Sequence, residues 1–266
     1  VCDLDQGSCE RFCGIECGDE CGNCPVDPQG GLYCTQSGLC SCDDPCVPDC
    51  TDKACGDDRC GGSCGSCGSD EICGYTPLAP TTQWTCEPFA GTDPAMSFFV
   101  TSRGSGPSWG KLGGLAGADA RCTQHAAEVG VFGKTWHAYL STGTVAARDR
   151  IGTGPWFNAK GQSIVPCTDN CIAALHSTGI PPELIVTERG ALLDWRNKHD
   201  VLTGSLPDGT ASGFDCADWT SNEATVEATV GHLDGDAFSW GSTHERGCDV
   251  LSMRCRGAGN IYCFAL

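Results

Sequence analysis

The sequence predicts an α+β domain that follows a small, disulfide-rich region with little regular secondary structure. One observation is the spread of the 24 cysteines along 266 residues: seventeen lie between Cys2 and Cys86, and only seven between Cys122 and Cys263. Such cysteine density is typical of small scaffolds that lack an apolar core. The other observation is a change of pattern near residue 96, after which one helix-spaced segment stands among short β-type runs. We therefore divide the chain into residues 1–92 and 93–266.

Residues 1–92 contain an internal repeat. The pattern Cys-Gly-Asp occurs at Cys17 and again at Cys55, and each copy runs on through further cysteines, which gives tandem units over 9–46 and 50–86. Glycine follows many of these cysteines and permits positive φ, so the chain can turn sharply between bridges. A Pro- and Thr-rich linker is expected to complete this region. The second unit resembles the Cys/Gly-rich repeats of large secreted bacterial proteins, which implies a bacterial surface or secreted protein but no activity.

Two kinds of chemistry compete for these cysteines. Cys21 and Cys24, like Cys64 and Cys67, have the Cys-x-x-Cys spacing of zinc ligands. No histidine occurs in the first 92 residues, however, and zinc sites rarely use so many cysteines. We therefore predict disulfides, which form in oxidising compartments and place the protein outside the cell or on its surface.

The charge of the chain limits its partners. The formal net charge is −18, with 16 acidic and 3 basic residues in 1–92. This balance argues against nucleic acid, heparin-like polyanions and anionic membranes as partners. No apolar stretch approaches the roughly 18 residues that span a bilayer, so we expect no membrane insertion. The sequence opens inside the cysteine-rich region at Val1, and we expect that any signal peptide has been removed or was never included.

The second domain is expected to contain one or two helices and several short strands. Residues 97–101 form a β-type run, and residues 134–140 alternate as a half-buried strand. Between them, residues 116–129 have helical spacing, and Gly130 is a stop signal. The chain ends in an apolar strand around 261–264. This mixture, with long irregular loops, is the basis for the α+β prediction.

Several segments of this domain resemble endostatin, the C-terminal domain of the multiplexin collagens and a branch of the C-type-lectin-like fold. The segments are 117–130, 136–141, 201–209, 216–221 and the pair Cys255 and Cys263 eight residues apart. The resemblance covers most of 96–266 and implies a C-type-lectin-like fold. It also implies two nested disulfides, Cys122–Cys263 and Cys216–Cys255.

Three cysteines then remain in the second domain. Cys167 and Cys171 can close a local loop, which leaves Cys248. Because both regions hold an odd number of cysteines, complete oxidation within the chain requires a bridge between them, and we predict that Cys248 provides it. Free thiols or an intermolecular bridge are the alternatives.

The ligand sites of calcium-dependent C-type lectins and of endostatin have no counterpart in this sequence. The Glu-Pro-Asn, Gln-Pro-Asp and Trp-Asn-Asp triplets of calcium-dependent lectins are absent, the arginines are scattered, and no histidine precedes His125. Asp234 and Asp236 could chelate Ca²⁺, the one cofactor for which we find candidate ligands, or form a simple Asp-Gly turn. His244 and Glu245 would need a third group to form a metal or acid–base site.

Tryptophans supply the remaining candidates for ligand binding. Trp109 and Trp156 follow Gly/Ser/Pro-rich turns and could stack on a sugar ring or a partner side chain, and Trp240 is undecided. The sequence contains no nucleophile elbow, HExxH, P-loop or Rossmann fingerprint, so we expect no enzyme. Two functions remain open. One is an adhesin- or lectin-like module that binds a glycan or surface protein through its loops. The other is a structural subunit that self-assembles into an extracellular filament, coat or matrix.

Overall fold

A computed structural model describes residues 33–34, 40–41, 50–51, 53–56, 64–68, 70–75, 84–193, 198–233, 235–249 and 257–266. The chain forms two compact units. The smaller unit comprises residues 1–51 and 57–64, and the larger comprises residues 52–56 and 65–266. In the smaller unit, strands β1 (Tyr33–Cys34) and β2 (Cys40–Ser41) pair antiparallel, and Cys50 is bonded to Cys64.

The larger unit begins further upstream than the sequence indicated. Its first element is an antiparallel hairpin of β3 (Glu71–Tyr75) and β4 (Trp84–Pro88), which the expected boundary at residue 92 assigned to the first domain. Trp84 is buried there against Cys55, and Leu192 packs on the same cluster. Apolar contact with the following domain is the physical reason why the hairpin belongs to it.

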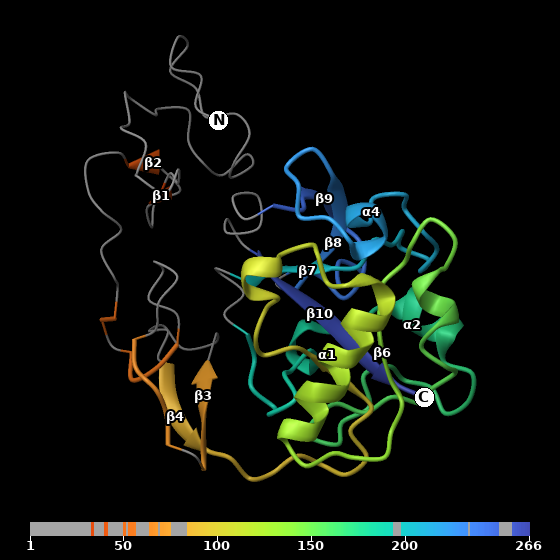
Figure 1. Cartoon of the computed structure of the whole chain (residues 1–266). Helices are drawn as coiled ribbons and strands as arrows, with labels where there is room; N and C mark the ends of the chain where they lie inside the picture. The colour runs from red at the N-terminus through yellow and green to blue at the C-terminus, as the bar shows by residue number, and fades with distance from the viewer. Residues whose placement is uncertain are drawn as a thin grey trace. The chain divides into compact units, whose positions relative to one another are not determined.

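A mixed six-stranded sheet forms the centre of the larger unit (Figure 1). Its strand order is β5-β10-β7-β8-β9, and β6 also pairs with β10. The strands are β5 (Phe98–Val100), β6 (Trp136–Ala138), β7 (Asp200–Leu202), β8 (Glu227–His232), β9 (His244–Gly247) and β10 (Gly257–Ala265). β7 is parallel to β10, whereas the other pairings are antiparallel. The protein is therefore a mixed α/β structure with few helices, as the α+β prediction required at its coarsest level.

The last strand is the structural centre of this sheet, because both of its faces are buried. Ile261 and Cys263 point into one apolar cluster, whereas Tyr262 and Phe264 point into another. Alternation of successive side chains between faces produces this division. Burial on both faces also explains why the C-terminal segment reads as a continuous apolar run.

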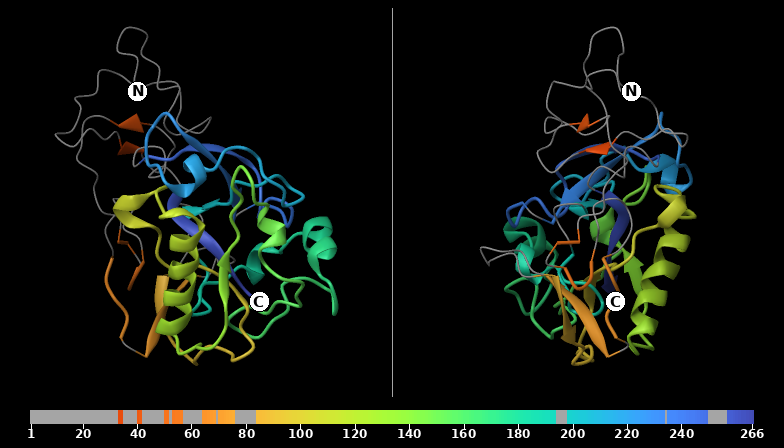
Figure 2. Two further views of the ribbon diagram at one scale, coloured as in Figure 1. Left: turned by 45° about the vertical axis from the view of Figure 1, so that its right-hand side comes forward. Right: turned by 90° about the vertical axis from the view of Figure 1, so that its left-hand side faces the viewer.

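Helix α1 (Gly114–Glu128) covers one face, alongside β6 and β10 (Figures 1 and 2). Its buried positions include Ala118, Cys122 and Ala126, which the helical spacing predicted. Gly130 follows the helix with a φ of +79°, which confirms the predicted stop. Helix α2 (Ile172–Thr178) buries Leu175 in the other cluster. No helix in the described part of the chain has the length and apolarity that a bilayer span needs.

Short helical turns complete the elements. Three are 3₁₀ turns: η2 (Gly106–Ser108), η3 (Ala147–Asp149) and η4 (Pro182–Leu184). The fourth, α4 (Cys216–Trp219), has positive φ at all four residues and is a left-handed turn. Trp219 is buried within it and donates from its indole to the Ser141 carbonyl at 2.8 Å, which ties the turn to the core.

Disulfides join further pairs of described residues. Cys55–Cys73 and Cys67–Cys86 hold the hairpin, and Cys122–Cys263 joins α1 to β10 across 141 residues, as the resemblance implied. Cys167–Cys171 closes the expected local loop. The structure assigns Cys64 and Cys67 to disulfides, so that spacing is not a zinc site.

Two cysteine predictions are wrong. Cys216 is bonded to Cys248, so the former does not pair with Cys255 and the latter does not bridge to the N-terminal region. The physical reason is the path of β8 and β9. Asp215 forms a bridge with Ala228 of β8, and the Cys248 N–H donates to the Val226 carbonyl, so both cysteines flank the start of one strand. The unassigned cysteine of residues 93–266 is therefore Cys255, which lies outside the described residues.

Candidate functional site

The predicted stacking residues lie mainly in the core. Trp156 and Trp240 are almost fully buried, and both rings pack against Phe264. Their placement corrects the expectation of a surface stacking role for the two rings. Trp109 is partly buried and packs against the apolar cluster that contains α1.

The predicted calcium ligands are described only in part. Asp234 lies outside the described residues. Asp236 uses one carboxylate oxygen to accept from the backbone N–H groups of Phe238 and Ser239, each at 3.0 Å, and from the Ser239 hydroxyl at 2.9 Å. Its carboxylate thus organises a tight turn, which is the simpler of the two alternatives that the sequence left open.

His244 lies in a polar cluster that the sequence did not reveal. The cluster is centred on Asp200, the first residue of β7, and includes His232 at the end of β8 and His244 at the start of β9. His199, which precedes β7, and Arg246 of β9 complete the set. Successive side chains of β9 point to opposite faces of the sheet, so Glu245 points away from the cluster, and it is exposed. The sequence showed that His244 needed further groups but gave no means of naming them.

Strand register explains why these residues meet. Asp200 lies opposite His232, and His244 lies opposite Val230, two residues before His232. Residues opposite one another, or two apart along a strand, share a face of the sheet. Asp200, His232 and His244 are therefore brought to one face, at one end of β7, β8 and β9. Figure 1 shows these three neighbouring strands.

The three imidazoles converge on one carboxylate oxygen. Oδ1 of Asp200 lies 3.2 Å from Nε2 of His199, 3.2 Å from Nε2 of His232 and 3.6 Å from Nε2 of His244. The rings are close to one another, with centroids 4.6 Å apart for His199 and His232, and 4.9 Å apart for His232 and His244. The other oxygen, Oδ2, accepts from Nε of Arg246 at 2.7 Å.

Burial and neighbouring charge shift the pKa of the Asp200 carboxyl group in opposite directions. Burial alone would raise the pKa of Asp200, because it disfavours the charged form. The three surrounding imidazoles and the Arg246 guanidinium outweigh that effect and hold the pKa well below its usual range. Contact with Asp200 raises the pKa of His244 in turn. Asp200 is thus an anion in the folded protein, surrounded by groups that can bind protons or metal ions.

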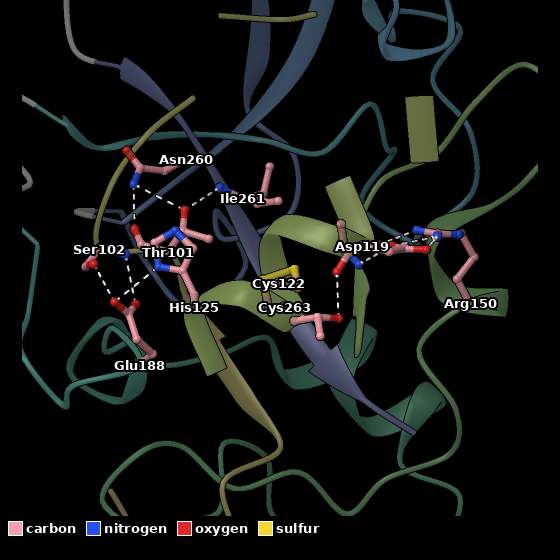
Figure 3. Close-up of a disulfide and its surroundings, with 12 residues drawn as sticks. Thr101, Ser102, Asp119, Cys122, His125, Arg150, Glu188, Asn260, Ile261 and Cys263 are labelled. Carbon is pink, nitrogen blue, oxygen red and sulfur yellow. Dashed lines mark hydrogen bonds and ion pairs between the residues drawn. A yellow bond between two sulfur atoms is a disulfide. The ribbon is translucent and has the colours of Figure 1, made fainter. Parts of the chain in front are cut away.

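A second polar cluster lies beside α1, where Figure 3 shows it next to the Cys122–Cys263 disulfide. Nδ1 of His125 is 3.1 Å from Oε1 of Glu188, and both side chains are buried. Glu188 also accepts from the backbone N–H of Ser102 at 3.0 Å and from the Ser102 hydroxyl. Hydrogen-bond donors therefore already occupy both carboxylate oxygens, which makes this cluster a structural network.

The same close-up shows a second attachment of α1 (Figure 3). Nη2 of Arg150 donates to both carboxylate oxygens of Asp119, at 2.7 and 2.9 Å. The backbone N–H of Ala138 donates to Oδ1 of the same carboxylate at 2.8 Å. The helix is thus fixed to β6 and to the loop that follows it.

Comparison with known proteins supplies no assignment for either cluster. No protein-family model matches the chain, and no curated protein matches it in sequence.

Proposed function

We propose that this protein is a secreted binding module in which residues 93–266 form a C-type-lectin-like, endostatin-like domain. The observation that carries the proposal is a surface loop, residues 203–215, which internal hydrogen bonds hold together and which exposes the apolar side chains of Leu206 and Phe214. The disulfides of the described residues support an extracellular location, because such bonds persist in oxidising compartments.

Hydrogen bonds hold this loop in one conformation although it lacks long regular elements. Ser205 and Ala211 form an isolated β-bridge, and the Leu206 N–H donates to the Thr210 carbonyl at 2.8 Å. At the base of the loop, the buried Ser205 hydroxyl is 2.8 Å from the Ser141 hydroxyl. A loop that is ordered before it meets a partner loses less conformational entropy on binding. Loops on a rigid scaffold are the usual carriers of binding function.

The exposed side chains favour a protein partner over a glycan. Leu206 and Phe214 are 45% and 41% exposed, so neither side chain belongs to the buried core. Trp156 and Trp240, the rings best suited to stacking on a sugar, are buried instead. Exposed aliphatic and Phe side chains suit the apolar centre of a protein–protein interface.

The proposal is tested by binding to arrays of purified extracellular proteins and of glycans, the latter with and without EDTA. We expect the full chain to bind a protein target and the double variant Leu206→Ser/Phe214→Ser to lose at least about tenfold in affinity, since interface apolar anchors contribute more than 1 kcal/mol each. Phe132→Ser is the matched control, because this ring is 74% exposed but lies on the loop after α1.

Other outcomes separate the alternatives. Glycan binding that survives the double variant would place recognition elsewhere on the domain and contradict the role of the 203–215 loop. Ordered polymers of the chain in electron micrographs, without binding on either array, would instead support a structural subunit of an extracellular assembly.

A further inference from the structure

The cluster around Asp200 has a feature that a simple hydrogen-bond network does not explain. Oδ1 of Asp200 is inaccessible to solvent, and no donor of the described residues meets hydrogen-bond geometry with it, although three imidazole nitrogens lie within 3.6 Å. Unsatisfied buried carboxylate oxygens are costly, so their presence in a folded protein calls for a partner.

The distances from Oδ1 of Asp200 to the three imidazole nitrogens match the edge lengths of a metal-centred tetrahedron. Zn²⁺ binds imidazole nitrogen and carboxylate oxygen at about 2.0–2.1 Å, so two ligand atoms of a tetrahedral site lie about 3.3 Å apart. The separations from Oδ1 to the three Nε2 atoms are 3.2, 3.2 and 3.6 Å. Potential ligand atoms of His199, Asp200 and His232 also lie within 4.8 Å of one another.

The surrounding groups orient the side chains as metal ligands. Arg246 donates to Oδ2 of Asp200 at 2.7 Å, which leaves Oδ1 for another partner. Nδ1 of His244 donates to the backbone carbonyl of Glu245 at 3.0 Å, which leaves Nε2 as the nitrogen that faces Asp200. Metal-bound histidines and carboxylates commonly have such outer partners.

We propose that His199, Asp200, His232 and His244 form a four-ligand site for Zn²⁺. The donor set is three imidazole nitrogens and one carboxylate oxygen, which suits a borderline ion of tetrahedral preference and not the oxygen-seeking Ca²⁺ or Mg²⁺. Because the side chain of His244 is 36% exposed, an ion can reach the site from solvent.

The site has a structural consequence. Three of its ligands come from β7, β8 and β9 and the fourth, His199, precedes β7, so a bound ion cross-links three strands at one end of the sheet. Four protein ligands fill a tetrahedral shell and leave no position for a reacting water, which is the arrangement of structural zinc sites. The proposal does not depend on what the 203–215 loop binds.

The experiment is a titration of the EDTA-treated, dialysed full chain with Zn²⁺ in competition with a chromogenic chelator. We expect one equivalent per chain. His244→Ala, at the most exposed ligand, and His232→Ala should each weaken binding by about 100-fold or more, which exceeds or matches the 10–100-fold that loss of an outer partner costs. His137→Gln is the matched control with unchanged affinity, because this histidine contacts the Arg150 carbonyl and lies outside the cluster.

Co²⁺ provides a test on the unmodified chain, so the proposal does not depend on the variants folding. Bound Co²⁺ should give the intense visible bands of a tetrahedral site without thiolate charge-transfer absorption. The proposal is overturned if the wild-type chain binds no Zn²⁺. It is also overturned if both histidine variants keep wild-type affinity, or if Co²⁺ shows octahedral or thiolate-bound spectra.

Discussion

Glu188 is a carboxylate that folding removes from water and surrounds with partners. Its side chain is 1% exposed and contacts His125 and Ser102. Burial alone would raise the pKa of Glu188, but the contacts with His125 and Ser102 outweigh burial and lower it. A carboxylate whose pKa is lower in the folded state than in the unfolded state stabilises the fold above its unfolded pKa, about 4.3. This contribution is lost as the pH falls through the folded-state pKa.

Replacing Glu188 by Gln therefore has a pH-dependent effect. At pH 7 we expect the free energy of unfolding to fall by about 1.5–3 kcal/mol, the usual contribution of hydrogen bonds to a charged group. Below about pH 4 the difference from wild type should shrink, because the carboxylate is then protonated in the unfolded state and, at still lower pH, in the folded state as well. Urea unfolding at several pH values measures both effects. Glu223→Gln, at an exposed position, is the control. An equal destabilisation at pH 7 and pH 3 would contradict this explanation.

At the scale of secondary-structure elements, sequence periodicity located the long helix and several of the strands that contribute side chains to the apolar clusters. Strands β5 and β6 lie within the segments that periodicity indicated, whereas α1 begins two residues before the predicted 116–129 and β10 extends beyond the predicted 261–264 at both ends. The candidate metal site could not be predicted in this way, because His232 and His244 meet Asp200 only through the register of β7, β8 and β9. Register depends on long-range pairing, which a single sequence does not display. The only available signal was that three of the six histidines lie between 199 and 244.

The connection between α4 and β9 provides an element-scale prediction. The Cys216–Cys248 bond spans 32 residues, and the chain-entropy model gives such a bond about 3–4 kcal/mol of stability. We expect Cys216→Ser/Cys248→Ser to lose about that much in denaturant unfolding. Cys167→Ser/Cys171→Ser, which opens a bond of separation 4, should lose only about 2 kcal/mol.

Peptide mapping under non-reducing conditions provides the direct check of this pairing. A fragment that joins the Cys216 and Cys248 peptides is expected. Recovery of Cys216 linked to Cys255 would show that the pairing suggested by the endostatin resemblance is correct after all.

At the scale of the whole molecule, the larger unit includes part of the cysteine-rich sequence. The hairpin β3–β4 is held by its own disulfides, yet it also contacts the following domain at two places. Leu192 packs on the cluster of Cys55 and Trp84, and the Arg189 guanidinium lies 5.1 Å from the centre of the Phe89 ring. A cysteine pattern marks where bridges form but not where apolar contacts end, which explains why the predicted boundary fell too late in the chain.

Because the β3–β4 hairpin packs against the following domain, a substitution in the hairpin is expected to change the local stability of the segment that it contacts. Trp84→Ala removes the largest side chain of the cluster, so amide hydrogen exchange should accelerate in 84–88 and also in 189–193, where Leu192 loses its packing partner. The disulfides Cys55–Cys73 and Cys67–Cys86 keep the hairpin closed, so the effect should appear as local opening without global unfolding. Phe132→Ala, at an exposed ring, should leave both segments unchanged. Acceleration confined to 84–88 would instead place the domain boundary after the hairpin, near residue 92.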